Sequence, residues 1–212
     1  MSVVTRINSD DVAILLIDHQ SGLFQTVKDI DVTALRNNVT TLAKIAAIEN
    51  IPVITTASEP NGPNGPLMPE IHKYAPHAVF VPRNGEINSW DTPAFVEAVK
   101  KTGKKKLIIG GVLTSVCVAF PSISAVSEGY EVFAVIDASG DMSPLSSQAT
   151  IARLSLAGVI PISTTAVCSE IQKTWHRPDA LQFAEAYSAV MPNYQAVIES
   201  FQKAESVGIS KK

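Results

Sequence analysis

The stretch "LIIGGVLTSVCVAF", Leu107 to Phe120, joins an aliphatic run to a segment of helical spacing through two glycines. An uninterrupted aliphatic run is typical of a parallel strand that is covered on both faces. The two glycines would let the end of this strand turn sharply into the helix. The stretch therefore predicts a strand–helix unit of an α/β sheet, with Cys117 at about the first turn of the helix.

The same alternation of strand and helix extends along most of the chain. Six aliphatic runs are predicted strands, at 12–18, 51–56, 77–81, 106–112, 130–138 and 158–163. Segments of helical spacing lie between them at 32–49, 92–102, 115–128 and 144–157, and several end near Gly or Asn. This pattern predicts a three-layer α/β/α sandwich with a mainly parallel, doubly wound six-stranded sheet and right-handed crossovers.

Two segments depart from this alternation. "SEPNGPNGPLMPEI", residues 58–71, is rich in Pro and Gly and longer than an ordinary connection, so we expect a lid or a pocket wall there. The segment after His176 reads as two further helices, at about 177–206, which lie across the sandwich or contact a neighbouring subunit. We expect residues 1–212 to form a single domain.

Composition narrows the class of protein. Of the 212 residues, 46% are hydrophobic and only 17% are charged. This composition is apolar for a soluble monomer, and it favours a sheet that is covered on both faces or an oligomer. The net charge of -3 and the scattered basic residues give no footprint for nucleic acid. No apolar run approaches the ~20 residues of a membrane span.

The two cysteines, Cys117 and Cys168, are too few for a disulfide framework, and no CxxC or Cys/His cluster suggests zinc. The N-terminal stretch "MSVVTRINSDD" lacks the apolar core of a signal peptide. We therefore expect two free thiols in a reducing cytoplasm, and no cofactor.

Three side chains that could do chemistry follow predicted strands, and ligands of an open parallel sheet bind beyond the carboxyl ends of its strands. Cys117 is either a buried hydrophobic residue or a nucleophile whose thiolate the helix start favours. Asp18 either caps a turn or takes the thiol proton. Arg83 is either a surface ion-pair partner or a charge that lowers the pKa of both other groups.

Other residues near these positions are candidates to line a pocket. They are Gln20, Phe24, Trp90 and Thr114. For Phe24 and Trp90 a place in the core is an equal alternative. Cys168 also follows a strand but has no reactive neighbour in the sequence, so we expect it to fill space in the core. The four histidines show no metal-ligand spacing, so we expect solvated or hydrogen-bonded side chains.

Three segments in this order resemble the isochorismatase-like cysteine hydrolases, and most closely the YcaC branch, whose substrate is unsettled. They are "ILLIDHQSGLF", "VPRNGEINSWDTPAF" and "LIIGGVLTSVCV", and the resemblance spans Val12 to Cys168. It implies a catalytic triad of Asp18, Arg83 and Cys117, with Arg83 where most members have lysine. It also implies a cis peptide between Val112 and Leu113 and an oxyanion hole formed by the backbone N–H groups of Leu113 and Cys117.

The resemblance implies a hydrolase that cleaves a C–N bond of a small amide or related carbonyl substrate through a thioester. Because an arginine cannot shuttle protons, Asp18 would be the sole proton carrier. The metal-binding Asp-x-His motif of nicotinamidases has no counterpart in "TTASEPNGPNG", so we expect no metal. Relatives are commonly homo-oligomers, with tetramers and octamers known. The alternative is a thiol redox sensor or a non-catalytic oligomeric module on the same fold.

Overall fold

The computed structural model describes residues 6–209 and contains one six-stranded sheet. The strands are β1 (Val12–Ile17), β2 (Val53–Ala57), β3 (Val79–Pro82), β4 (Lys106–Gly111), β5 (Glu131–Val135) and β6 (Ile160–Ile162). Their order is β3-β2-β1-β4-β5-β6, and each neighbouring pair is parallel. The predicted doubly wound sheet is confirmed. Its order reverses between β1 and β4, where such sheets form their ligand crevice.

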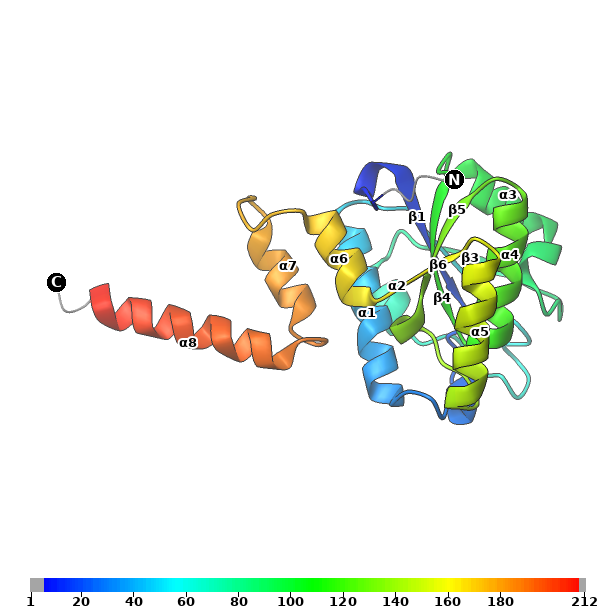
Figure 1. Cartoon of the computed structure of the whole chain (residues 1–212), viewed down its shortest axis with the longest axis horizontal. Helices are drawn as coiled ribbons and strands as arrows, with labels where there is room; N and C mark the ends of the chain where they lie inside the picture. The colour runs from blue at the N-terminus through cyan, green and yellow to red at the C-terminus, as the bar shows by residue number, and fades with distance from the viewer. Residues whose placement is uncertain (1–5, 210–212) are drawn as a thin grey trace.

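Helices cover both faces of the sheet, as Figure 1 shows. On one face lie α1 (Val32–Ile48), α6 (Thr164–Gln172) and α7 (Ala180–Tyr187), with the short α2 (Glu70–Tyr74) packed beside α1. On the other face lie α3 (Pro93–Lys101), α4 (Ala119–Ser127) and α5 (Pro144–Leu156). The three predicted layers are therefore present.

Short helical turns connect several of these elements. They are the 3-10 turns η1 (Ser9–Asp11), η2 (Leu23–Thr26), η3 (Ser89–Asp91) and η5 (Ile136–Ala138), and the π-helical turn η4 (Thr114–Val118). The predicted helix 115–128 thus begins as a π-helical turn and continues as α4. Helices α2 and α6 were not predicted, and the predicted strand 130–138 includes what is the turn η5.

Local sequence explains where the helices begin. Asp31 accepts a hydrogen bond from the N–H of Ala34 at the start of α1. Ser143 and Ser163 cap α5 and α6 in the same way. These side chains satisfy N–H groups that have no partner inside the helix, which stabilises each helix by about 1 kcal/mol. Pro144 at the first position of α5 fits because its missing N–H would be unpaired there anyway.

The two glycines of β4 serve close packing and not the sharp turn that we expected. Neither has a positive φ. A Cβ on Gly110 would lie 3.0 Å from the carbonyl oxygen of Ala138, and one on Gly111 would lie 2.6 Å from that of Ile17. The Cβ on Gly111 would also lie 3.2 Å from Val118 at the start of the following helix. The glycines therefore allow β1, β4 and this helix to approach one another closely.

Replacing Gly111 by alanine is expected to lower the free energy of unfolding by about 1–3 kcal/mol, because the Ile17 carbonyl is backbone and cannot rotate away. Urea unfolding measures this change. Gly208→Ala is the matched control, because a Cβ there meets nothing within 4 Å. A glycine inside a helix is about 1 kcal/mol less favourable than an alanine, so this variant is expected to lose no stability. A Gly111→Ala protein as stable as the unchanged chain would contradict this account.

The C-terminal helix α8 (Pro192–Ile209) extends away from the sandwich, as Figure 1 shows, and meets it through α7 and through the contact of Tyr194 with Trp175. Two further helices after His176 were predicted, and α7 and α8 are those helices. The described residues do not include 1–5 and 210–212. The first five residues of the stretch "MSVVTRINSDD" therefore lie outside them. Within residues 6–209, no helix combines the length and apolar character needed to span a membrane.

Candidate active site at the ends of β1, β3 and β4

Asp18 directly follows β1, and its backbone has a positive φ of 57°, which is uncommon for a residue with a side chain. Its carboxylate is fully buried. Oδ1 accepts hydrogen bonds from the Arg83 guanidinium and, at 3.0 Å, from the N–H of Ser58. Oδ2 is also buried and has no well-aligned donor in the described part of the chain. One oxygen of Asp18 is thus anchored while the other is available.

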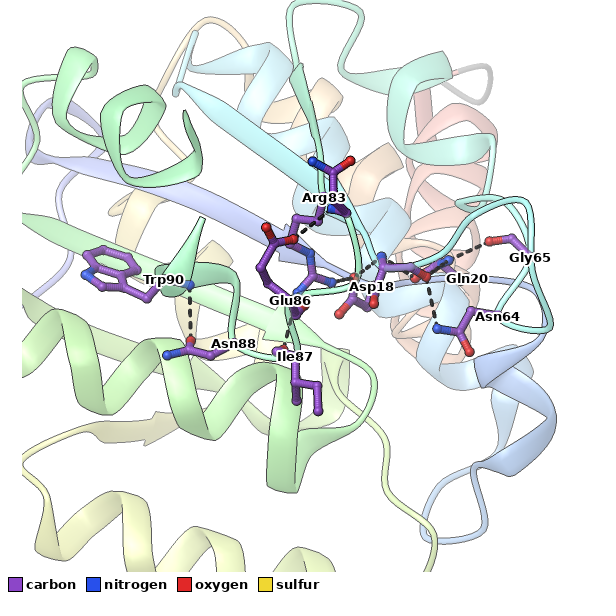
Figure 2. A network of polar contacts seen from close by, with 11 residues as sticks. Asp18, Gln20, Asn64, Gly65, Arg83, Glu86, Ile87, Asn88 and Trp90 are labelled. Atoms are coloured by element: carbon purple, nitrogen blue, oxygen red, sulfur yellow. Dashed lines mark hydrogen bonds and ion pairs between the residues drawn. The ribbon is translucent and has the colours of Figure 1, made fainter. Parts of the chain in front are cut away.

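Arg83 follows β3, and its side chain is fully buried. The guanidinium points toward Asp18, as Figure 2 shows. Its Nη1 donates hydrogen bonds to the carbonyl oxygens of Glu86, at 2.9 Å, and Ile87, at 3.2 Å. Its Nη2 donates to Asp18. Because a guanidinium stays charged and its donors form a rigid fork, these three bonds fix a positive charge beside the carboxylate.

Cys117 lies in the π-helical turn after β4, and its side chain is buried beside Asp18. The peptide between Val112 and Leu113 is cis, as the resemblance implied. The N–H of Cys117 donates to the carbonyl of Leu113 at 2.8 Å. This N–H is therefore already engaged in the turn, and its expected place in an oxyanion hole stays a prediction. The N–H of Leu113 stays a prediction for that role.

The pKa values of the acid and the thiol shift against our expectation. Burial raises the pKa of Asp18, and the charge and hydrogen bond of Arg83 offset only part of that rise. Burial also raises the pKa of the Cys117 thiol, as do the charge of Asp18 and its hydrogen bond. We expected Arg83 to lower both, but loss of water outweighs its charge. The resting pair is therefore a neutral thiol beside a carboxylate that binds protons more readily than usual.

The helix start also does less for the sulfur than we expected. The N–H of Thr114 donates to the carbonyl of Gly140 at 2.8 Å. The N–H of Ser115 donates to Oδ2 of Asp141 at 2.9 Å. These first N–H groups of the turn are thus already paired and do not stabilise a thiolate. The hydroxyl of Thr114, by contrast, is buried and has no partner in the described residues.

Gln20 holds the segment 58–71 in place. Its Nε2 donates to the carbonyls of Ser58, at 2.9 Å, and Gly65, at 2.5 Å, and its Oε1 accepts from the N–H of Ser58 at 3.0 Å. Asn64 also donates to the carbonyl of Ser58 at 2.9 Å. Figure 2 shows Gln20, Asn64 and Gly65 on the same side of Asp18. The segment is thus a tethered wall beside Asp18, and Gln20 is its anchor.

The other pocket candidates lie in the core. Trp90 packs edge-on against Phe95 and Tyr130, and its indole N–H donates to Glu128 at 2.8 Å. Phe24 is buried in the core cluster that α1 covers. These contacts favour the alternative in which both rings fill space.

The second cysteine and three of the four histidines have structural roles. Cys168 is fully buried in the core on the α1 side, and burial raises its pKa. His19 bonds through Nε2 to the carbonyl of Ala138 at 2.9 Å, and burial lowers its pKa to about 4. His72 and His77 also bond to protein oxygens. Across residues 6–209, no group of three or more His, Cys, Asp or Glu side chains is placed to hold a metal ion.

Comparisons with known proteins agree with this architecture. The family model described as the isochorismatase domain matches residues 12–166. The curated protein described as probable hydrolase YcaC, from Escherichia coli K12, is 43% identical over 196 residues, which are 92% of this chain and 94% of the relative.

Two solved structures extend this similarity to the fold. The YcaC gene product of Escherichia coli, described as an octameric hydrolase of unknown specificity, matches with a TM-score of 0.92 and 42% identity, covering 96% of this chain and 100% of that one. YcaC from Pseudomonas aeruginosa, solved with hexane-2,5-diol and covalent acrylamide, matches with a TM-score of 0.91 and 44% identity, covering 95% and 100%. The chain therefore belongs to the isochorismatase family, in the group of hydrolases that includes YcaC.

Proposed function

We propose that this protein hydrolyses a C–N bond of a small amide or related carbonyl compound, with Cys117 as the nucleophile. One observation carries the proposal: Arg83 anchors one oxygen of the buried Asp18 carboxylate, and the other oxygen has no well-aligned donor. The thiol of Cys117 lies beside this carboxylate. An acid and a nucleophile in direct contact are what acyl transfer to sulfur requires.

Asp18 carries the proton in each step. It takes the thiol proton as the sulfur attacks the carbonyl carbon, and it gives that proton to the nitrogen as the C–N bond breaks and the amine leaves. A water then attacks the thioester while Asp18 accepts its proton. The C–S bond breaks, the carboxylic acid leaves, and the proton returns to the sulfur. The raised pKa of Asp18 favours this role, because it makes the carboxylate a stronger base.

Arg83 orients the base and balances charge without exchanging protons. When Asp18 is ionised, the guanidinium neutralises it where both side chains are fully buried. When Asp18 is protonated, the bonds from Arg83 to the carbonyls of Glu86 and Ile87 still hold the arginine in place. The site therefore keeps its geometry while a single proton moves between oxygen, sulfur and substrate.

Covalent trapping tests the assignment. Acrylamide is an amide whose carbon–carbon double bond reacts with thiols. The Pseudomonas aeruginosa relative is described as holding acrylamide covalently. When this protein is treated with acrylamide and digested, mass spectrometry is expected to find the adduct on the peptide that contains Cys117 and not on the one that contains Cys168. An adduct on Cys168 alone, or none at all, would remove the support for a nucleophilic Cys117.

A thiol redox sensor is the weaker candidate. Oxidation by peroxide requires a thiolate that is accessible, and burial raises the pKa of both thiols. Both cysteines are free thiols in the structure. A non-catalytic module would give no adduct in the trapping experiment, so the same measurement separates it from the enzyme.

We also infer that residues 1–212 act as one domain that assembles through α8. Tyr194, Val197 and Phe201 lie at spacings of three and four on this helix and are 42%, 61% and 68% exposed. Exposed apolar side chains that share one face mark a contact surface. The Escherichia coli relative, all of which this chain covers, is described as octameric. A second copy of the chain is therefore the partner that we propose for this face.

Replacing Phe201 by glutamate is expected to shift the mass in solution from the oligomer to smaller species, because a charge would be buried at the contact. Multi-angle light scattering after gel filtration measures the mass. Gln202→Glu adds the same charge to the neighbouring exposed position outside the stripe and is expected to leave the oligomer intact. A monomeric unchanged chain, or an equal effect of the two variants, would contradict the assignment of α8.

A further inference from the structure

Asp141 is a fully buried acid in the connection between η5 and α5, next to the turn that carries Cys117. Asp141 is not among the candidates predicted from the sequence. Its side chain accepts four hydrogen bonds, and its own N–H donates to Oδ1 of Asp29 at 2.7 Å. A buried carboxylate with this many partners is held in a single orientation.

Two of the four bonds come from the nucleophile turn. Oδ2 accepts the N–H of Ser115 at 2.9 Å, and Oδ1 accepts the hydroxyl of Ser115 at 3.1 Å. The other two, from the hydroxyl of Ser146 at 3.0 Å and the N–H of Met142 at 2.8 Å, tie Oδ1 to α5 and to the connection itself. Asp141 thus links the turn of Cys117 to a different helix of the sandwich.

The position of this link matters because Ser115 is only two residues from Cys117. The N–H of Cys117 bonds within the same turn, to the carbonyl of Leu113. The connection that contains Asp141 also bonds to this turn through its backbone, because the carbonyl of Gly140 accepts the N–H of Thr114. The connection that contains Asp141 thus fixes the first two N–H groups of the turn. The orientation of the turn decides where the Cys117 sulfur lies relative to Asp18.

We propose that Asp141 is a positioning residue that holds the Cys117 turn so that the sulfur faces Asp18. This inference rests on the proposed function of Cys117. Asp141 touches neither the sulfur nor Asp18 through any of its hydrogen bonds, so it acts on the reaction only through Ser115. A carboxylate suits this role because both of its oxygens accept, and an amide in its place would turn a donor toward Ser115 or toward the other donors.

The experiment measures the rate constant for inactivation at saturating acrylamide, kinact, and the half-saturating concentration, KI, in the full-length protein. Asp141→Asn replaces one of the two acceptor oxygens with a donor, so at least one bond from Ser115 or from the other donors is lost, and Ser115→Ala removes only the hydroxyl bond of the turn. Ser146→Ala is the matched control, since it removes one hydroxyl bond to the same oxygen from the side of α5. Thermal unfolding of each variant is recorded, and labelling is measured well below the lowest midpoint.

We expect kinact to fall about ten-fold in Asp141→Asn and by a smaller factor in Ser115→Ala, with KI unchanged, because a small displacement of a reacting atom is costly. Ser146→Ala is expected to keep the kinact of the unchanged protein. If Asp141→Asn does not fold, the comparison of Ser115→Ala with Ser146→Ala decides. Equal kinact values in those two variants would overturn the role of Asp141 alone. An unchanged protein without a Cys117 adduct would overturn the proposed function as well.

Discussion

Replacing Cys117 by alanine is expected to abolish covalent labelling by acrylamide and to remove all measurable hydrolysis of any amide substrate. Alanine has no atom that can form the thioester, and the neighbouring Asp18 and Arg83, whose side chains are fully buried against each other, cannot replace it. Intact-protein mass spectrometry checks the labelling, and the release of amine checks the hydrolysis. This is the largest effect expected from a single substitution in the chain.

Cys168→Ala is the matched control for this variant. Cys168 is also a buried free thiol with a pKa raised by burial, but it lies in the core on the α1 side. Its loss removes one buried sulfur, which is expected to lower stability and leave the labelling of Cys117 unchanged. If Cys117→Ala were still labelled or still active while Cys168→Ala was not, the nucleophile would be Cys168.

The catalytic candidates could be found from sequence because each follows a strand of a parallel sheet. Asp18 follows β1, Arg83 follows β3, and Cys117 is in the turn that follows β4. The carboxyl ends of parallel strands share one edge, so the prediction of the fold also brought these residues together. The spacing of the helices and their capping residues similarly placed most of the three layers.

Asp141 could not be found in this way, because its role depends on a contact between segments 26 residues apart. In the sequence it is an acid in a short polar connection before a proline, which is typical of a solvated loop. The glycines of β4 gave a similar problem. The close approach of Ile17 to Gly111 depends on the distance between strands, and the sequence does not contain that distance.

The direction of the pKa shifts also needed the structure. The presence of an arginine suggested lower pKa values for Asp18 and Cys117, since an opposite charge stabilises an anion. In the structure the loss of hydration on burial exceeds that stabilisation for both groups. This balance changes the chemistry that we propose. The nucleophile does not rest as a thiolate, so its proton must be removed as it attacks, and a neighbouring base becomes essential.

Replacing Asp18 by asparagine tests that base through the pH dependence of labelling by acrylamide. In the unchanged protein the ionised carboxylate takes the thiol proton, so the rate is expected to rise with pH through the pKa of Asp18. Burial places this pKa above its ordinary value of 3.8. Above it the rate is expected to stay level to about pH 9, because the raised pKa of Cys117 keeps direct ionisation small.

In Asp18→Asn the rate at pH 7 is expected to fall by about 10²–10⁴-fold, which is the usual contribution of a positioned base. The remaining rate is expected to climb about ten-fold per pH unit, because only the small thiolate fraction reacts. Removing the charge of Asp18 also removes one cause of the raised thiol pKa, so the deficit should shrink at alkaline pH. Asp137→Asn, which changes a carboxylate that bonds to Thr164, is expected to keep the level profile. A level profile in Asp18→Asn would mean that another group takes the proton.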